Sequence, residues 1–137
     1  MILKRSRCAG FRASICRSSG RPIRSRPCSV APESFTLARL RLRRPNLKDA
    51  DAMFAIGADP EVAHFADWPL STERGAALER LRQRAEQWDA GVEYYWIITL
   101  AHDDRAIGAI STCVDRDAAD VGYLLDRRQW GHGYATE

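Results

Sequence analysis

The chain has 137 residues, enough for one domain with a single hydrophobic core, and a formal net charge of +3. No apolar run approaches the roughly 20 residues of a membrane-spanning helix, so the sequence predicts no membrane partner. The charge is unevenly divided. Residues 1–32 hold eight Lys/Arg and no acidic residue, whereas residues 33–137 hold 13 basic and 18 acidic residues. The mildly acidic main part gives no support for nucleic-acid binding through charge.

Residues 1–34 are rich in Arg and Ser and are predicted to be disordered. Three explanations remain open for this segment. It resembles a mitochondrial transit peptide, it could bind nucleic acid or an acidic surface, or translation has been assigned to begin too early. The last is favoured, because no clean amphipathic stripe is present and the domain-like pattern begins abruptly at Phe35.

The four cysteines indicate a reducing compartment. Cys8, Cys16 and Cys28 are spaced too irregularly for a zinc site, and no metal is predicted. Cys113 stands alone in an apolar strand pattern, where it is expected to pack as a small hydrophobic residue. Since nothing suggests a disulfide framework, we expect the protein in the cytoplasm.

The main part is predicted to begin with a half-buried strand over residues 35–43, because apolar and basic residues alternate there. One face carries Ala38, Leu40 and Leu42, and the other carries Arg39, Arg41 and Arg43. The arginines are expected on a solvated face rather than in a phosphate site. Asn46 is predicted to cap a helix that Asp59-Pro60 ends.

Residues 61–70 are predicted to be a connection, anchored by Val62, Phe65 and Trp68. A second helix is expected to start at Ser71 or Thr72, to carry one apolar stripe, and to end at Gly91.

Three strands are then expected. Residues 94–100 are almost wholly apolar, which predicts a central strand buried on both faces, with its aromatic side chains in the core. Residues 106–115 form the next strand, with Gly108 as a bulge, and residues 120–125 form the last. The predicted order is β-α-α-β-β-β, of the α/β (α+β) class.

A glycine turn follows the last strand. The string from Arg128 to Gly133 fits the pattern R/Q-x-x-G-x-G/A at every fixed position, and residues 134–137 can begin a helix. Backbone N–H groups in such a turn can bind phosphate, because glycine allows close approach and a helix N-terminus favours anions. A P-loop is excluded by the missing Lys-Ser/Thr pair. The dinucleotide fingerprint is excluded because Thr136 occupies its third glycine position.

The strand, the turn and the extension W-G-H-G-Y-A-T-E together resemble the pyrophosphate loop of the GNAT superfamily of acetyl-CoA-dependent N-acetyltransferases. The fuller string is similar to the branch related to ribosomal-protein N-acetyltransferases. The resemblance covers residues 35–137 and implies the front part of a GNAT-like fold, a mostly antiparallel sheet with flanking helices. It also implies acetyl-CoA as co-substrate and a primary amine, on a small molecule or a protein N-terminus, as acceptor.

The resemblance assigns roles to particular residues. Backbone groups of Tyr123, Leu124 and Leu125 would hold the pantetheine arm and polarise the acetyl carbonyl. The pyrophosphate would lie on the loop, formed by Arg128, Gln129, Trp130, Gly131, His132, Gly133 and Tyr134. Asp120 stands where many family members have the general base, and an ion pair with Arg105 or Arg116 is the alternative role left open for it.

The sequence stops inside the motif, so it is expected to encode a truncated form that neither folds stably nor turns over by itself. An alternative to an N-acetyltransferase is a non-catalytic acyl-CoA-binding remnant. Nucleic-acid binding through residues 1–32 is a third hypothesis, and a homodimer is left open. The acceptor and the general acid are not indicated by any pattern.

Overall fold

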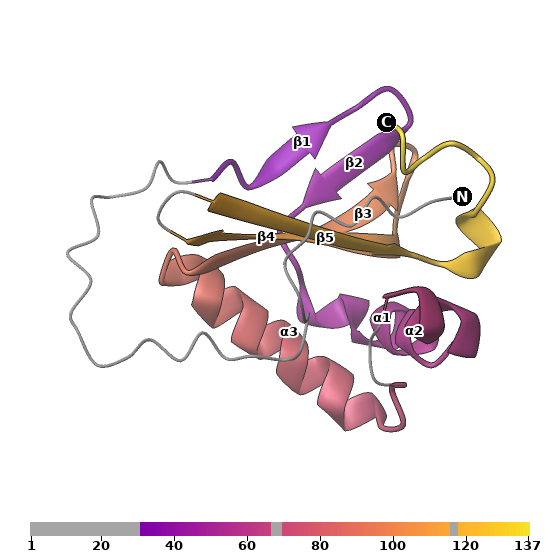
Figure 1. The fold of residues 1–137 in the computed structure, drawn as a ribbon, viewed down its shortest axis with the longest axis horizontal. Helices are drawn as coiled ribbons and strands as arrows, with labels where there is room; N and C mark the ends of the chain where they lie inside the picture. The colour runs from indigo at the N-terminus through magenta and orange to yellow at the C-terminus, as the bar shows by residue number, and fades with distance from the viewer. Residues whose placement is uncertain (1–30, 67–69, 116–117) are drawn as a thin grey trace.

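The computed structural model describes residues 31–66, 70–115 and 118–137. For residues 113–115 and 118–120 it describes the backbone alone. These residues form one five-stranded antiparallel sheet in the order β1-β2-β3-β4-β5. The strands are β1 Ser34–Thr36, β2 Leu40–Arg43, β3 Glu93–Leu100, β4 Asp103–Asp115 and β5 Ala118–Leu125. Figure 1 shows the helices together on one face of the sheet. The α+β class and the antiparallel sheet with flanking helices are thereby confirmed.

The first strand differs from the prediction. The single strand expected over residues 35–43 is a hairpin, in which Phe35 lies opposite Leu42 and the amide of Leu37 donates to the carbonyl of Leu40 at 2.8 Å. Folding back supplies β2 with a neighbour on its outer edge and places Phe35 edge-on to Trp96, with ring centres 5.6 Å apart. The sequence predicts the alternation of side chains correctly, but it does not predict the turn between Thr36 and Leu40.

Two helices follow the hairpin in place of one. Asn46 caps a 3₁₀ turn, η1 Leu47–Asp49, that continues into α1 Ala50–Gly57, as the Asn46 side chain predicted. Residues expected to be a connection instead form α2 Pro60–Ala66, which corrects the prediction. Asp59 accepts a hydrogen bond from the amide of Glu61 at 2.9 Å, and proline is well suited to a first helical position. Asp-Pro therefore ends one helix and begins the next.

The longest helix, α3 Arg74–Asp89, starts two to three residues later than expected, after Glu73 in an extended conformation. It ends with Ala90 and then Gly91 at a φ of +65°, as predicted. The loop after β5 contains one further 3₁₀ turn, η2 Arg127–Gln129. Trp68 and residues 1–30 lie outside the described residues. The disorder expected over residues 1–34 is corrected at its end, because Ser34 begins β1.

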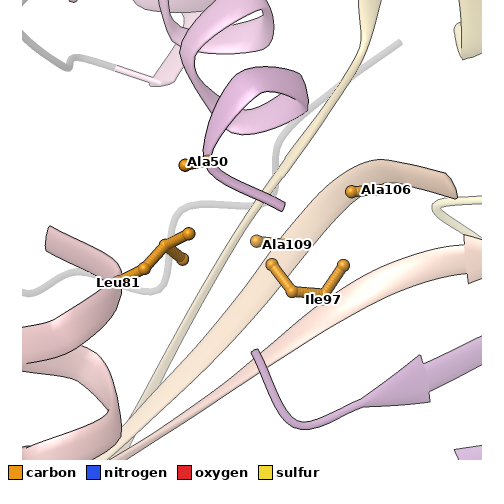
Figure 2. Packing of buried hydrophobic residues seen from close by; sticks show 5 residues of the cluster. All are labelled: Ala50, Leu81, Ile97, Ala106 and Ala109. Atoms are coloured by element: carbon orange, nitrogen blue, oxygen red, sulfur yellow. The ribbon is translucent and has the colours of Figure 1, made fainter. Parts of the chain in front are cut away.

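The core lies on both faces of β3. On the helix side a cluster joins α1 and α3 to the sheet, and Figure 2 shows its five side chains converging: Ala50, Leu81, Ile97, Ala106 and Ala109. On the other side Ile98 packs with Leu40, Ile107 and Leu125. Ile97 has no exposed surface, so the prediction of a central strand buried on both faces is confirmed.

The aromatic residues of β3 belong to the core, as expected. Trp88 from α3 packs edge-on against Tyr94 and Trp96, with ring centres 5.3 and 5.1 Å away. The indole nitrogen of Trp96 donates to the carbonyl oxygen of Pro32 at 3.0 Å. This bond satisfies a buried N–H group and attaches the chain before β1 to the sheet.

Strand β4 bends where the register with β3 shifts. Ala106 lies opposite Thr99 and Gly108 opposite Ile98, so Ile107 is the extra residue of a bulge just before the glycine. A Cβ at position 108 would lie 2.3 Å from the carbonyl oxygen of Leu124. Gly108 therefore allows β5 to approach β4 closely at the end of β5 that carries the glycine turn.

The arginines of β2 are not uniformly solvated, contrary to expectation. Arg43 is 11% exposed and binds Asp49, itself 4% exposed, through two bonds of 2.8 and 2.7 Å. Arg43 also donates from Nε to Asp104 at 2.7 Å. Its hydrogen bonds with Asp49 raise the pKa of Arg43. The hydrogen bond from Lys48, and to a smaller extent that from Arg43, lowers the pKa of Asp104. The network joins β2, η1 and the start of β4.

Candidate functional site at the end of β5

The glycine turn begins with a capped 3₁₀ turn. The side chain of Asp126 accepts from the amide of Arg128 at 3.0 Å and pairs with its guanidinium at 2.5 Å. Arg128 thereby lowers the pKa of Asp126. This aspartate holds the arginine at the base of the turn, and Arg128 does not line the cavity described below.

The two glycines give the turn its shape. Gly131 has a φ of +79° and Gly133 a φ of +75°, values in the left-handed region that residues with a Cβ rarely adopt. Of the residues that the structure describes, none accepts a hydrogen bond from the amides of Gly131, His132, Gly133 or Tyr134. Four consecutive backbone donors are thus available to a ligand, an arrangement suited to an anion.

The turn is not followed by a helix in this structure, which corrects the expectation for residues 134–137. One bond, from the amide of Thr136 to the carbonyl of Gly133 at 3.2 Å, closes a single turn. The first turn of a helix is its costly step, since it fixes several residues for one hydrogen bond. Glu137 instead binds Arg39, and the ion pair of their side chains measures 2.8 Å.

A cavity of about 200 Å³ lies between the end of β5, α2 and the turn. Its lining is mainly apolar and aromatic, with backbone groups of the glycine turn at one side. The residues are Val62, Phe65, Ala66, Tyr123, Leu124, Leu125, Gln129, Trp130, Gly131, Gly133, Tyr134 and Ala135. Since β5 pairs only with β4 among the described strands, backbone groups along its outer edge are also open to a ligand.

Two exposed aromatic side chains form a wall of the cavity. Phe65 of α2 is 50% exposed and Trp130 of the turn is 36% exposed, and their rings meet edge-on at 5.1 Å. The indole nitrogen of Trp130 donates to the carbonyl of Leu125 at 3.0 Å. This bond fixes the ring orientation, so the wall joins the end of β5 to α2.

The structure gathers most of the predicted binding residues at this cavity. Eight of them line it: Tyr123, Leu124, Leu125, Gln129, Trp130, Gly131, Gly133 and Tyr134. His132 lies beside it, stacked on Tyr134 at 5.6 Å, and its Nδ1 is 3.0 Å from the carbonyl oxygen of Trp130. Arg128 lines a separate open groove of about 550 Å³ with Asp59 and Arg127. Asp120 belongs to β5, opposite Cys113, but both side chains lie outside the described part.

Sequence reasoning missed the contribution of α2, because residues 60–66 were expected to form no helix. Val62 and Phe65 were recognised only as anchors of a connection, whereas helical spacing places both at the cavity. Arg39 was also missed as a neighbour of the turn. The Asp-Pro pair was the available signal for α2.

Within residues 31–66, 70–115 and 118–137, no group of three His, Cys, Asp or Glu side chains could hold a metal ion. No helix among the described residues is long and apolar enough to cross a membrane. The site thus combines backbone donors, an apolar cavity and an unpaired strand edge. This arrangement defines a protein that can bind a ligand with an anionic group at one end and a slender, largely apolar part.

Comparison with known proteins identifies the class. The family model described as an acetyltransferase (GNAT) domain matches residues 39–137, and the chain belongs to this family. It is 29% identical over 108 residues to the uncharacterized N-acetyltransferase p20 of Bacillus licheniformis. That match covers 77% of this chain and 61% of the relative.

Solved structures share the fold. RimL, a ribosomal L7/L12 alpha-N-protein acetyltransferase in complex with coenzyme A, gives a TM-score of 0.64 at 19% identity, covering 76% of this chain and 62% of RimL. The microcin C7 self-immunity acetyltransferase MccE, in complex with acetyl-CoA and AMP, also gives 0.64 at 19% identity, covering 79% and 63%. The chain therefore spans less than two thirds of the length of these relatives.

Proposed function

We propose that this GNAT domain takes part in transferring an acetyl group from acetyl-CoA to a primary amine. The observation that carries the proposal is the row of four amides in the glycine turn that no described residue binds, placed beside an apolar cavity at a strand edge that pairs with no further described strand. Membership of the acetyltransferase family and the coenzyme A and acetyl-CoA complexes of RimL and MccE support it.

The residues present fit coenzyme A. The amides of residues 131–134 would bind the pyrophosphate, because oriented N–H groups at positive-φ glycines form an anion-binding concavity. Leu124, Leu125 and Trp130 offer an apolar wall for the pantetheine arm. Backbone groups of Tyr123, Leu124 and Leu125 would hold the arm's amides and stabilise the developing oxyanion.

The reaction requires a neutral amine. Its nitrogen attacks the thioester carbonyl carbon, the C–S bond breaks, coenzyme A leaves as the thiol, and the amine loses one proton. An amine with a pKa of about 8–10 is mostly protonated at neutral pH, so a general base assists. We assign this role to Asp120, on the edge strand β5. Because aspartate is one methylene shorter than glutamate, it would act through a bridging water.

Asp120→Asn tests that assignment. It should lower kcat at least tenfold, because general-base catalysis contributes roughly 10²–10⁴-fold, while leaving the Kd for acetyl-CoA within about twofold. The acid limb of the pH–rate profile should also flatten. Wild-type kcat at neutral pH would assign Asp120 to a structural role, such as pairing with an arginine.

The acceptor is the finer part of the proposal. RimL acts, by its description, on the alpha-amino group of a ribosomal protein, which supports a protein N-terminus as one acceptor class. A small primary amine is the other. We place the reaction in the cytoplasm, in agreement with the cysteine pattern.

Thiol release from acetyl-CoA, measured with a peptide bearing a free N-terminus, a polyamine and a free amino acid, tests the function. Contrary to the expectation from the sequence that the chain does not turn over by itself, we expect release with at least one of these acceptors and none with an N-acetylated copy of the peptide. Calorimetry with coenzyme A provides the second readout. Binding without turnover would instead favour a non-catalytic acyl-CoA-binding protein, and absence of binding would contradict both.

A further inference from the structure

Arg39, in the connection between β1 and β2, contacts the glycine turn from more than 90 positions away in the sequence. Its Nη1 donates to the carbonyl oxygen of His132 at 2.9 Å and its Nη2 to that of Gly133 at 3.4 Å. Figure 1 shows the C-terminal end of the chain beside the β1–β2 connection. One side chain thus holds the two carbonyl groups at the centre of the turn.

The same residue is fixed on its other side. Its backbone amide and its Nε donate to the two carboxylate oxygens of Glu137 at 2.7 and 2.8 Å, and the guanidinium lies 4.8 Å from the centre of the Tyr134 ring. The Arg39 amide, whose hydrogen bond favours the charged form, lowers the pKa of Glu137. Arg39 is therefore oriented by its own contacts and is not a mobile surface cation.

These bonds determine where the loop amides point. In a planar trans peptide the C=O and the following N–H point in opposite directions. When Arg39 binds the oxygen of His132, the N–H of Gly133 is turned away from the β1–β2 connection. The bond to the oxygen of Gly133 turns the N–H of Tyr134 away in the same manner.

We propose that Arg39 is a positioning residue for the phosphate-binding turn. It holds the carbonyls of His132 and Gly133 so that the next two amides face a bound pyrophosphate. The inference rests on the proposed function, because it names how the same loop is prepared for coenzyme A. Arg39 acts through the backbone, and its donors are already directed at protein oxygens.

The test compares Arg39→Ala with Arg41→Ala, which removes an exposed arginine from the same hairpin whose side chain makes no hydrogen bond, ion pair or ring contact with a described residue. Kd is measured by calorimetry for coenzyme A and for pantetheine, which lacks the pyrophosphate. Arg39→Ala should weaken coenzyme A roughly tenfold to hundredfold, the range expected when hydrogen bonds to a charged group are lost. Pantetheine should change by less than about twofold, and Arg41→Ala should match wild type for both ligands.

Each result is decisive. If the wild type binds coenzyme A, two results for Arg39→Ala would overturn the positioning role alone. One is an equal loss of affinity for coenzyme A and pantetheine, and the other is no loss of affinity for either. Failure of the wild type to bind coenzyme A would overturn the proposed function and this inference with it. If Arg39→Ala does not fold, Glu137→Gln decides. This variant weakens the anchor of Arg39, so a selective loss of coenzyme A supports the inference and an unchanged Kd overturns it.

Discussion

Three arginines alternate along residues 39–43, and the structure gives each a different role. Arg39 binds the glycine turn, Arg41 is exposed, and Arg43 is half-buried in an ion pair with the buried Asp49. The alternation determines only which residues lie on the same face of the hairpin. What that face meets depends on η1 and on the turn after β5, which are distant in sequence, so the sequence pattern alone could not distinguish the three.

The pair of Arg43 with the buried Asp49 leads to a first prediction. Asp49→Asn leaves the half-buried Arg43 charge with a weaker partner and should lower the free energy of unfolding by roughly 1.5–3 kcal/mol, the range for hydrogen bonds to a charged group. Asp51→Asn is the matched control, because Asp51 pairs with Arg74 at the surface, where both side chains are at least 64% exposed. Its stability in urea should be nearly unchanged. Equal effects of the two variants would show that the Arg43 pair contributes no more than a surface pair.

Asp104 gives a prediction for pH. Its pKa in the folded protein lies below the ordinary value of 3.8, because Lys48 and Arg43 favour the carboxylate. The folded state therefore binds fewer protons than the unfolded state. The stabilisation is complete above the unfolded pKa and is lost as the pH falls through the folded pKa.

Thermal melts from about pH 7 to about pH 2.5 should show this loss, and Asp104→Asn should reduce the change in Tm over that interval. The mutant curve should also lie lower at neutral pH. A mutant whose Tm falls as steeply with acid as that of the wild type would exclude Asp104 as a contributor.

At the scale of elements, the site depends on how closely β5 approaches β4. Gly108→Ala would place a Cβ 2.3 Å from the backbone oxygen of Leu124, a contact that backbone movement alone can relieve. We expect a loss of stability of about 1–3 kcal/mol, as in overpacked cores, with weaker coenzyme A binding because Leu124 and Leu125 shift. Gly75→Ala is the control. Its Cβ meets nothing within 4 Å in α3, and it should stabilise the protein by about 0.4–1 kcal/mol.

The elements that the sequence predicted correctly are those whose signals are local. The apolar run of β3, the Asn46 cap and the glycine turn each follow from residue types in one window. The hairpin at residues 34–43 and α2 were missed for a different reason. Asp59-Pro60 was interpreted only as the end of a helix, and that it also begins α2 depends on packing against β5. The backbone-binding part of the candidate site could therefore be predicted, but the wall formed by Phe65 could not.

At the scale of the whole molecule, residues that precede β1 are hydrogen-bonded to the sheet and to the residue after β2. Trp96 is 7% exposed, and its indole N–H donates to Pro32, which precedes the strand. The amide of Arg44 donates to the carbonyl of Glu33 at 2.9 Å. The domain boundary proposed from composition, after residue 34, would remove both acceptors.

Two truncated chains test where the folded unit begins. A chain starting at Ala31 should keep the Tm of the full chain, because the composition of residues 1–30 cannot bury enough apolar surface to offset the entropy of ordering. A chain starting at Phe35 should melt at least about 4 °C lower. It leaves the buried Trp96 N–H without its acceptor, at a cost of about 1–3 kcal/mol, and each kcal/mol shifts Tm by roughly 4–8 °C in a domain of this size. Trp96→Phe provides the control, since without the indole N–H the two truncations should differ less. Equal Tm values for the two truncations with Trp96 intact would place the start of the folded unit at Phe35.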